Sequence, residues 1–138
     1  MARIMAIDYG IKRTGIAVTD PLQIIATGLT TIATPGLIDF LTGYIQKEEL
    51  EKIIIGYPVN LDDSDTHATK AVQHIIKKIR STFPHLPVIE VDERFTSKMA
   101  KQAMIDMGLR KKQRRQKSTV DKIAATIILQ EYLHHSLP

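Results

Sequence analysis

One short run, residues 52–56, constrains the fold more than any other part of the sequence. It reads Lys-Ile-Ile-Ile-Gly and is almost entirely apolar. A strand that is apolar on both sides is typical of a parallel sheet whose two faces are covered by other elements. A strand with one solvent-exposed face would instead alternate apolar and polar residues. Residues 3–8 and 88–91 are also short and mostly apolar, and they predict two further buried strands.

The other predicted elements alternate with these strands. Residues 16–19 and 24–32 are predicted to be strands, the second with an irregularity at Gly28, and a turn at 8–15 makes the first two strands a hairpin. Apolar residues recur at helical spacing in four segments, 37–45, 68–79, 96–107 and 118–133. The order predicts an α/β fold in which an antiparallel portion joins parallel βα units, with helices on both faces.

The length and composition set the class of protein. With 138 residues, the chain is expected to form one domain, 1–138, that buries a core without covalent staples. The absence of cysteine excludes disulfides and thiolate zinc sites and favours a reducing compartment. No leader pattern and no apolar run near 18 residues is present, so we expect a cytoplasmic protein without a membrane partner.

The positive charge is concentrated in one segment. Six of the 19 lysines and arginines lie within residues 110–117. The rest of the chain has 13 lysines and arginines and 15 acids, so it carries no excess of positive charge. The six are Arg110, Lys111, Lys112, Arg114, Arg115 and Lys117. A local cluster of this kind predicts a polyanionic partner, above all nucleic acid. The alternative is a solvated loop, and the nearby acid Asp121 favours the functional interpretation.

Three acids stand where the chain changes direction. Asp8 ends the strand at 3–8, Glu93 follows the strand at 88–91, and Asp121 opens the last helix. Because buried strand ends meet at a common edge of a sheet, these carboxylates could converge. Carboxylates are the ligands that Mg²⁺ or Mn²⁺ prefers. A metal site beside a cationic segment is what phosphodiester chemistry requires.

Each acid also has a purely structural explanation. Asp8 could shape an Asx turn, and Glu93 could pair with Arg94 at the surface. Residues 118–121, Ser-Thr-Val-Asp, have the spacing of a capping box, which would make Asp121 a helix-start acid. Yet Asp121 shares a helical face with Ala124, Ala125 and Ile128, and the two alanines leave room beside its carboxylate.

Other polar residues are candidates for substrate contacts. Lys12 and Arg13 are expected on the turn after Asp8, within reach of phosphate oxygens. Asn60 follows the strand at 52–56 and could contact substrate or stabilise its own loop. Arg94 could position the loop or bind phosphate. The five histidines fit no metal-binding pattern.

Four segments in this order resemble the YqgF family, also called RuvX or Holliday-junction-resolvase-like: 8–17, 56–60, 92–97 and 120–125. The resemblance spans nearly the whole chain. It implies a ribonuclease H-like fold with a five-stranded mixed sheet, ordered 3-2-1-4-5 and flanked by helices. It also implies a metal-dependent nuclease that trims the 5′ end of precursor 16S rRNA, with an acidic triad on Asp8, Glu93 and Asp121.

Two positions depart from the family pattern. Asp63 stands where the loop after Asn60 usually has glycine, and Ala124 stands where the related RuvC resolvases carry another aspartate. Three carboxylates should hold a second metal more weakly than four. The departure at Ala124 therefore favours nuclease chemistry in general over junction resolution.

Three functions remain open from the sequence. The first is metal-dependent hydrolysis of structured RNA, with precursor rRNA favoured over a DNA junction. The second is resolution of four-way DNA junctions, which requires two active sites and hence a dimer. The third is a non-catalytic RNA- or ribosome-binding module, which the lack of aromatic residues within 110–117 favours. The oligomeric state stays open.

Overall fold

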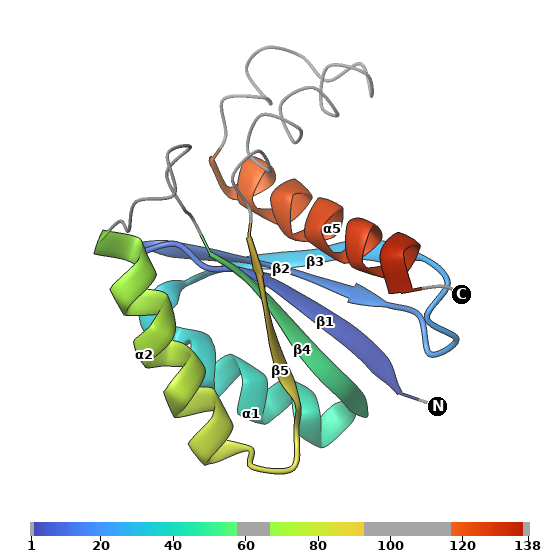
Figure 1. Cartoon of the computed structure of the whole chain (residues 1–138), viewed down its shortest axis with the longest axis horizontal. Helices are drawn as coiled ribbons and strands as arrows, with labels where there is room; N and C mark the ends of the chain where they lie inside the picture. The colour runs from blue at the N-terminus through green and yellow to red at the C-terminus, as the bar shows by residue number, and fades with distance from the viewer. Residues whose placement is uncertain (1, 58–66, 93–116, 137–138) are drawn as a thin grey trace.

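The computed structural model describes residues 2–57, 67–92 and 117–136. Five strands form one sheet in the order β3-β2-β1-β4-β5, which confirms the predicted order (Figure 1). The strands are β1 (Arg3–Asp8), β2 (Arg13–Thr19), β3 (Ala26–Ala33), β4 (Leu50–Tyr57) and β5 (Val88–Asp92). The helices are η1 (Thr34–Gly36), α1 (Leu37–Lys47), α2 (His67–Thr82) and α5 (Lys117–Ser136).

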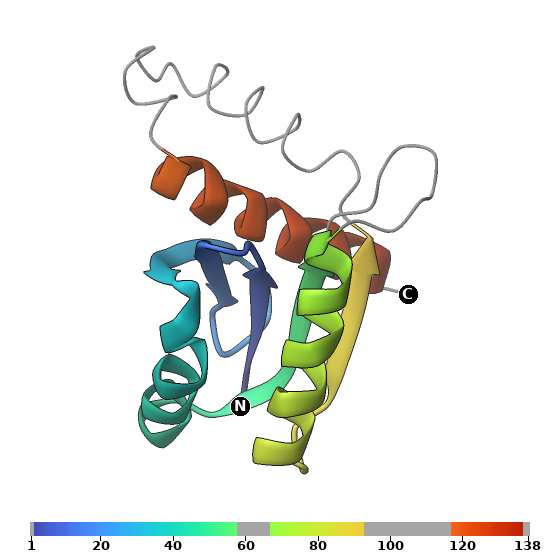
Figure 2. The same ribbon diagram turned by 90° about the vertical axis from the view of Figure 1, so that its left-hand side faces the viewer.

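The sheet is mixed, as predicted. β1 pairs with β2 and β2 with β3 in antiparallel fashion, whereas β1 runs parallel to β4 and β4 parallel to β5. The carboxyl ends of β1, β4 and β5 therefore meet at one edge of the sheet. Figures 1 and 2 show this edge at the top of the molecule, with the start of α5 beside it.

Helices cover both faces of the sheet. α5 lies across one face, while α1 and α2 lie on the other (Figure 2). Alternation along β1 divides its side chains between the two layers. Met5 and Ile7 pack in the core with α1 and α2, whereas Ile4 and Ala6 pack with α5.

The all-apolar run at 52–56 is explained by this two-sided cover. Ile53, Ile54 and Ile55 are all completely buried. Ile53 and Ile55 belong to the core beneath α1 and α2, and Ile54 belongs to the core beneath α5. At these three positions the strand is covered on both faces, so the side chains on both faces are apolar.

β2 begins at Arg13, three residues before the predicted start at Ile16. Thr14 is completely buried, and its hydroxyl lies 2.9 Å from that of Thr34. Gly15 pairs with Asp8 in the sheet. Polar Thr14 and flexible Gly15 look like turn residues, but tertiary pairing makes them part of the strand. Arg13 therefore lies in β2 rather than on the turn, while Lys12 stays in the turn.

β3 carries the irregularity predicted at Gly28. Ile16 pairs with Thr30 but Ala17 pairs with Gly28, so the strand holds one extra residue, Leu29. A Cβ atom at Gly28 would lie 2.7 Å from Cγ of Lys122 on α5. The glycine thus lets α5 approach the edge strand closely.

The last helix begins at Lys117, one residue earlier than predicted, and its first turn contains no acid. The capping box at 118–121 is therefore wrong, since Ser118 lies within the helix instead of capping it. The predicted helix at 96–107 lies outside the described residues. No helix in the described part of the chain is long and apolar enough to cross a membrane.

β3 starts at Ala26 rather than at Ile24, because Asp20 organises the preceding loop. Its Oδ1 accepts hydrogen bonds from the backbone N–H groups of Ile24 (2.8 Å) and Ile25 (2.7 Å), and Oδ2 accepts one from Leu22 (3.1 Å). Gln23 has a positive φ of 59°. These contacts hold the loop out of the sheet ladder.

The Asp20 loop predicts a pH-dependent contribution to stability. The hydrogen bond from Ile25, with those from Ile24 and Leu22, lowers the pKa of Asp20. A lowered pKa in the folded state stabilises the fold above the unfolded value of about 3.9, and the effect is lost as the pH falls through the folded value. Asp20→Ala should lower the urea midpoint near pH 7, and the deficit should shrink as the pH falls below about 4. A loss in urea midpoint that does not change with pH would contradict this role of Asp20. The same pH-dependent loss in an Asp39→Ala chain would also contradict it.

Candidate active site

Asp8 occupies a distinctive place in the sheet. It is the last residue of β1, and its cross-strand neighbours are Gly15 of β2 and Gly56 of β4. Neither neighbour has a side chain, so no cross-strand side chain lies directly beside the half-buried Asp8 in its row of the sheet. A side chain introduced at either glycine position would lie next to Asp8.

The Asp8 side chain belongs to the α5 face. Alternation along β1 puts it on the same side as Ile4 and Ala6, which pack against α5. Asp8 therefore lies at the edge of the sheet and beneath the layer that α5 forms, instead of facing α1 and α2.

The direction of α5 brings its first turns to the same edge. Nζ of Lys52, near the start of β4, donates a hydrogen bond of 3.1 Å to the hydroxyl of Tyr132, near the end of α5. This bond raises the pKa of Lys52. The end of α5 therefore lies near the start of β4, while Lys122 and Thr126, nearer the start of the helix, lie beside Gly28 of β3. The start of α5 lies on the side of the molecule where β1 and β4 end (Figure 1).

Asp121 belongs to the early part of α5, and its side chain lies outside the described part of the structure. Ala125, one turn later, is completely buried in a cluster with Ala6 and Ile54. Asp121 lies one helical turn before this helix–sheet contact. Ala124 is 2% exposed, so the position of a fourth acid in RuvC resolvases is here a buried methyl group.

β5 is the third strand whose carboxyl end lies at this edge of the sheet. Tyr57 of β4 pairs with Asp92, the last residue of β5. Val91 packs on the α5 side of the sheet, and Glu93 is the residue two positions after it in the sequence. Glu93 itself lies outside the described residues.

Several predicted substrate contacts also fall outside the described residues. These are Asn60, Arg94, Arg110, Lys111, Lys112, Arg114 and Arg115. Lys117 is the first residue of α5, and Lys12 is exposed in the turn that follows Asp8. Within the described ranges no group of three histidines or acids is close enough to hold a metal ion. Of the three predicted ligands, only Asp8 is described there with its side chain, because Glu93 and the side chain of Asp121 lie outside the described part of the structure.

Thr34 fixes the turn that follows Asp8, a feature that the sequence analysis missed. Its hydroxyl donates to the carbonyl of Gly10 (2.6 Å), and its N–H donates to the carbonyl of Lys12 (3.1 Å). Thr14 then donates to the Thr34 hydroxyl. A Cβ at Gly10 would collide with the carbonyl oxygen of Arg13. The turn is therefore tightly folded and held from η1, which no local sequence signal reveals because Thr34 is 24 residues from Gly10.

The Asp8 edge suits a divalent cation. The Asp8 carboxylate offers hard oxygen donors, and its two cross-strand neighbours are glycines. Asp8 alone is insufficient, because Mg²⁺ in proteins is usually held by one or two carboxylates together with substrate oxygens. Asp121 lies in the first turns of α5, and Glu93 follows the last residue of β5 in the sequence.

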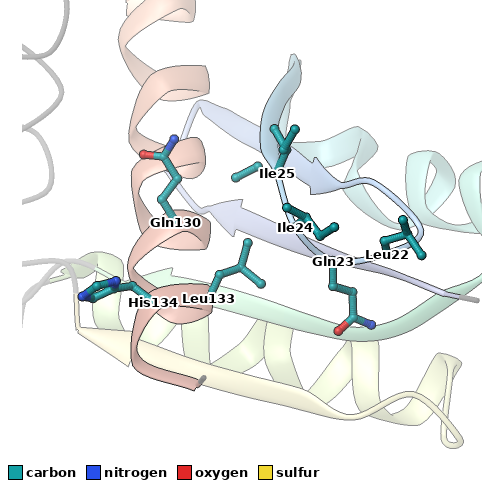
Figure 3. A pocket seen from close by; sticks show the side chains of 8 residues that line it. Leu22, Gln23, Ile24, Ile25, Gln130, Leu133 and His134 are labelled. Carbon is teal, nitrogen blue, oxygen red and sulfur yellow. The ribbon is translucent and has the colours of Figure 1, made fainter. Parts of the chain in front are cut away.

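A groove lies at the opposite end of the molecule from this edge. It has a volume of about 540 Å³ and lies between the Asp20 loop and the end of α5 (Figure 3). Its apolar lining includes Ile24, Ile25 and Leu133, and no acid is among its described lining residues. The groove is therefore separate from the candidate active site.

The topology defines a ribonuclease H-like α/β fold. The structure is similar to that of RuvC from T. thermophilus, solved in complex with a Holliday junction substrate, with a TM-score of 0.54 and 14% sequence identity. The likeness covers 98% of this chain and 95% of that one, and at this identity it shows the fold alone. A model of the RuvX family, described as Holliday junction resolvase, matches residues 2–135. The chain belongs to the RuvX family.

Curated relatives match over almost the full chain. A protein of Christiangramia forsetii is 54% identical over 134 residues, which cover 97% of this chain and 99% of the relative. One of Flavobacterium psychrophilum is 54% identical over 133 residues, covering 96% and 97%. Both bear the name "Putative pre-16S rRNA nuclease".

Proposed function

We propose that this chain is a divalent-metal-dependent nuclease that hydrolyses phosphodiester bonds at the 5′ end of precursor 16S rRNA. The observation that carries the proposal is Asp8 at the end of β1 with a glycine on each side, at the edge where α5 begins. The names of the curated relatives support the substrate. A substrate of this kind agrees with the expected cytoplasmic location.

Three acids would hold Mg²⁺ or Mn²⁺ in this proposal. Asp8 anchors the cation from the sheet, Asp121 contributes from the first turns of α5, and Glu93 contributes from beyond β5. A divalent ion there would lower the pKa of bound water and stabilise negative charge on the leaving oxygen. The protein's part is to hold the carboxylates on the rigid ends of strands and a helix, so that little reorganisation is needed during reaction.

Basic residues would position the nucleic acid. Lys12 is exposed on the turn clamped by Thr34, and Arg13 begins β2 beside it, so both can meet phosphates near Asp8. The cations of 110–117 would bind the backbone further along, with Arg94 and Asn60 as additional contacts. If all six cations of that segment touch phosphates, log K against log salt should fall with a slope of roughly −4 to −5.

A cleavage assay with defined metals tests the proposal. The purified chain is incubated with a 5′-extended precursor 16S rRNA fragment in Mg²⁺, in Mn²⁺ and in EDTA. We expect shortening at the 5′ end with either metal and none in EDTA. Cleavage that is equally fast in EDTA would contradict metal dependence. Binding without cleavage under every condition would favour the non-catalytic RNA-binding module.

Junction resolution is the second candidate, because the family model is described as a Holliday junction resolvase and the fold is that of RuvC. Symmetric cutting of a four-way junction needs two active sites and therefore a dimer. The buried Ala124 removes one acid from the set expected for a resolvase. A four-way DNA junction in the same assay decides between the substrates: paired, symmetric nicks would support resolution, and an intact junction beside cleaved RNA would exclude it.

A further inference from the structure

The outer face of α2 carries a basic stripe that no function has yet explained. Lys70, His74, Lys77 and Lys78 are all exposed. Their spacing of four, seven and eight residues from Lys70 places them on one side of the helix. The opposite side holds Val72, Ile76 and Ile79, which are buried against the sheet. We call the four exposed residues the α2 stripe.

The helix that bears the α2 stripe contains no acid. Its 16 residues include four lysines or arginines and no aspartate or glutamate, although the whole chain has 15 acids. Like charges three or four residues apart destabilise a helix by a few tenths of a kcal/mol per pair, and Lys77 and Arg80 are such a pair. An ordinary surface helix relieves that repulsion with interspersed acids, and α2 does not.

Within the described part of the chain, the three lysines of the α2 stripe form no ion pair. Arg80 differs, because its NH2 group donates a 2.8 Å hydrogen bond to the carbonyl of Val88 and so fastens α2 to β5. The lysines are therefore available to a partner, whereas Arg80 serves the fold.

The position of α2 connects the stripe to the Asp8 edge. β4 ends at Tyr57 beside the row of Asp8, and α2 is the next described element of the chain. The other end of α2 lies at the start of β5, as the Arg80–Val88 bond shows. The helix thus runs from the Asp8 edge along the outside of the molecule (Figures 1 and 2). Lys70 and Lys78 are eight residues apart, roughly 12 Å along the axis.

We propose that the α2 stripe binds the phosphate backbone of the nucleic acid whose scissile bond lies at the Asp8 edge. This inference rests on the proposed nuclease function and adds a second contact surface to it. Lysines act as point charges toward phosphates and set the register of the strand without reading its sequence. The stripe would hold the part of the substrate that passes around the edge of the sheet onto α2. The preceding acids Asp62, Asp63 and Asp65 lie outside the described residues.

Salt-dependent binding to a catalytically inactive chain tests this proposal. In an Asp8→Asn background, dissociation constants for the 5′-extended precursor 16S rRNA fragment are measured at several salt concentrations. Replacing Lys70, Lys77 and Lys78 by glutamine should reduce the magnitude of the log K against log salt slope by roughly 2 to 3, since each phosphate contact contributes about 0.7 to 0.9. Glutamine is a good helix former, so α2 should keep its helicity.

Matched variants separate a local contact from a change of net charge. The same three positions changed to arginine keep the charge and should restore the slope. Lys47→Gln removes one exposed cation at the end of α1 and should leave the slope unchanged, whereas Lys70→Gln should reduce it by roughly 0.7 to 0.9.

The outcomes distinguish this inference from the proposed function. An unchanged slope in the triple glutamine variant would overturn the role of the α2 stripe and leave the active site untouched. A triple arginine variant that behaves like the glutamine variant would also overturn it, because the charge would then be irrelevant. Failure of the parent chain to bind the RNA at any salt concentration would overturn both proposals.

Discussion

An Asp8→Asn chain is expected to lose metal-dependent cleavage by about 10³-fold or more while keeping its fold. Asparagine has nearly the same shape, but its neutral amide is a poor substitute for a carboxylate that binds a divalent cation. Stabilisation of charge by a bound metal is worth several kcal/mol, and each 1.4 kcal/mol changes a rate about tenfold. The measurement is the initial rate of cleavage of the 5′-extended RNA at saturating Mn²⁺.

Two comparisons make this result specific. Asp39→Asn removes the same charge from an exposed position in the first turn of α1, and it should cleave at the wild-type rate. The affinity of the Asp8→Asn chain for RNA should not fall, because the substitution removes a negative charge near the phosphates. Retention of even half of the wild-type rate would exclude Asp8 as a metal ligand.

Truncation of Ile54 should have the largest effect on stability. Its side chain is completely buried between β1 and β5, in the cluster formed with Ala125, Ile128 and Leu129 of α5. Ile54→Ala would leave a cavity beneath α5 and should cost about 2–5 kcal/mol, a large part of the roughly 5–15 kcal/mol that stabilises a domain. The check is the free energy of unfolding in urea.

Graded and exposed variants control for the chemical change. Ile54→Val should cost only about 0.5–1.5 kcal/mol, since it removes a single methylene. Ile11→Ala, at a residue that is 61% exposed, should change the free energy of unfolding by no more than about 0.5 kcal/mol. A loss below about 1 kcal/mol for Ile54→Ala would mean that α5 does not pack on the sheet as described.

Local patterns predicted the strands and helices well where burial matches periodicity. The run Ile53–Ile54–Ile55 required a strand covered on both faces, and it lies between two helical layers. Prediction failed where tertiary contacts override local preference. Thr14 and Gly15 became part of β2 because Thr14 pairs with Ile32 of β3 and Gly15 pairs with Asp8 of β1, partners that a local pattern does not contain.

The candidate site was predictable only in part. Asp8, Glu93 and Asp121 were recognisable because each stands where the chain changes direction, and the resemblance to the RuvX family implied that they form one acidic triad. The capping box, the alternative explanation of Asp121, does not match the helix, because α5 starts at Lys117 and lacks an acid in its first turn. The α2 stripe escaped notice, although its residues were visible, because their common face and its place at the Asp8 edge depend on how α2 is laid against the sheet.

The sequence by itself determined, for the described elements, the middle of each strand and helix and which of its faces is buried, because side-chain periodicity is a local property of the chain. Only the tertiary structure decided that Asp8 lies between Gly15 and Gly56, that Thr34 clamps the adjoining turn, and that α2 runs away from the same edge. Gly56 is distant from Asp8 in the sequence, and its place beside it is set by the register of β1 against β4. That register follows from the packing of both strands between two layers of helices, which no single stretch of sequence encodes.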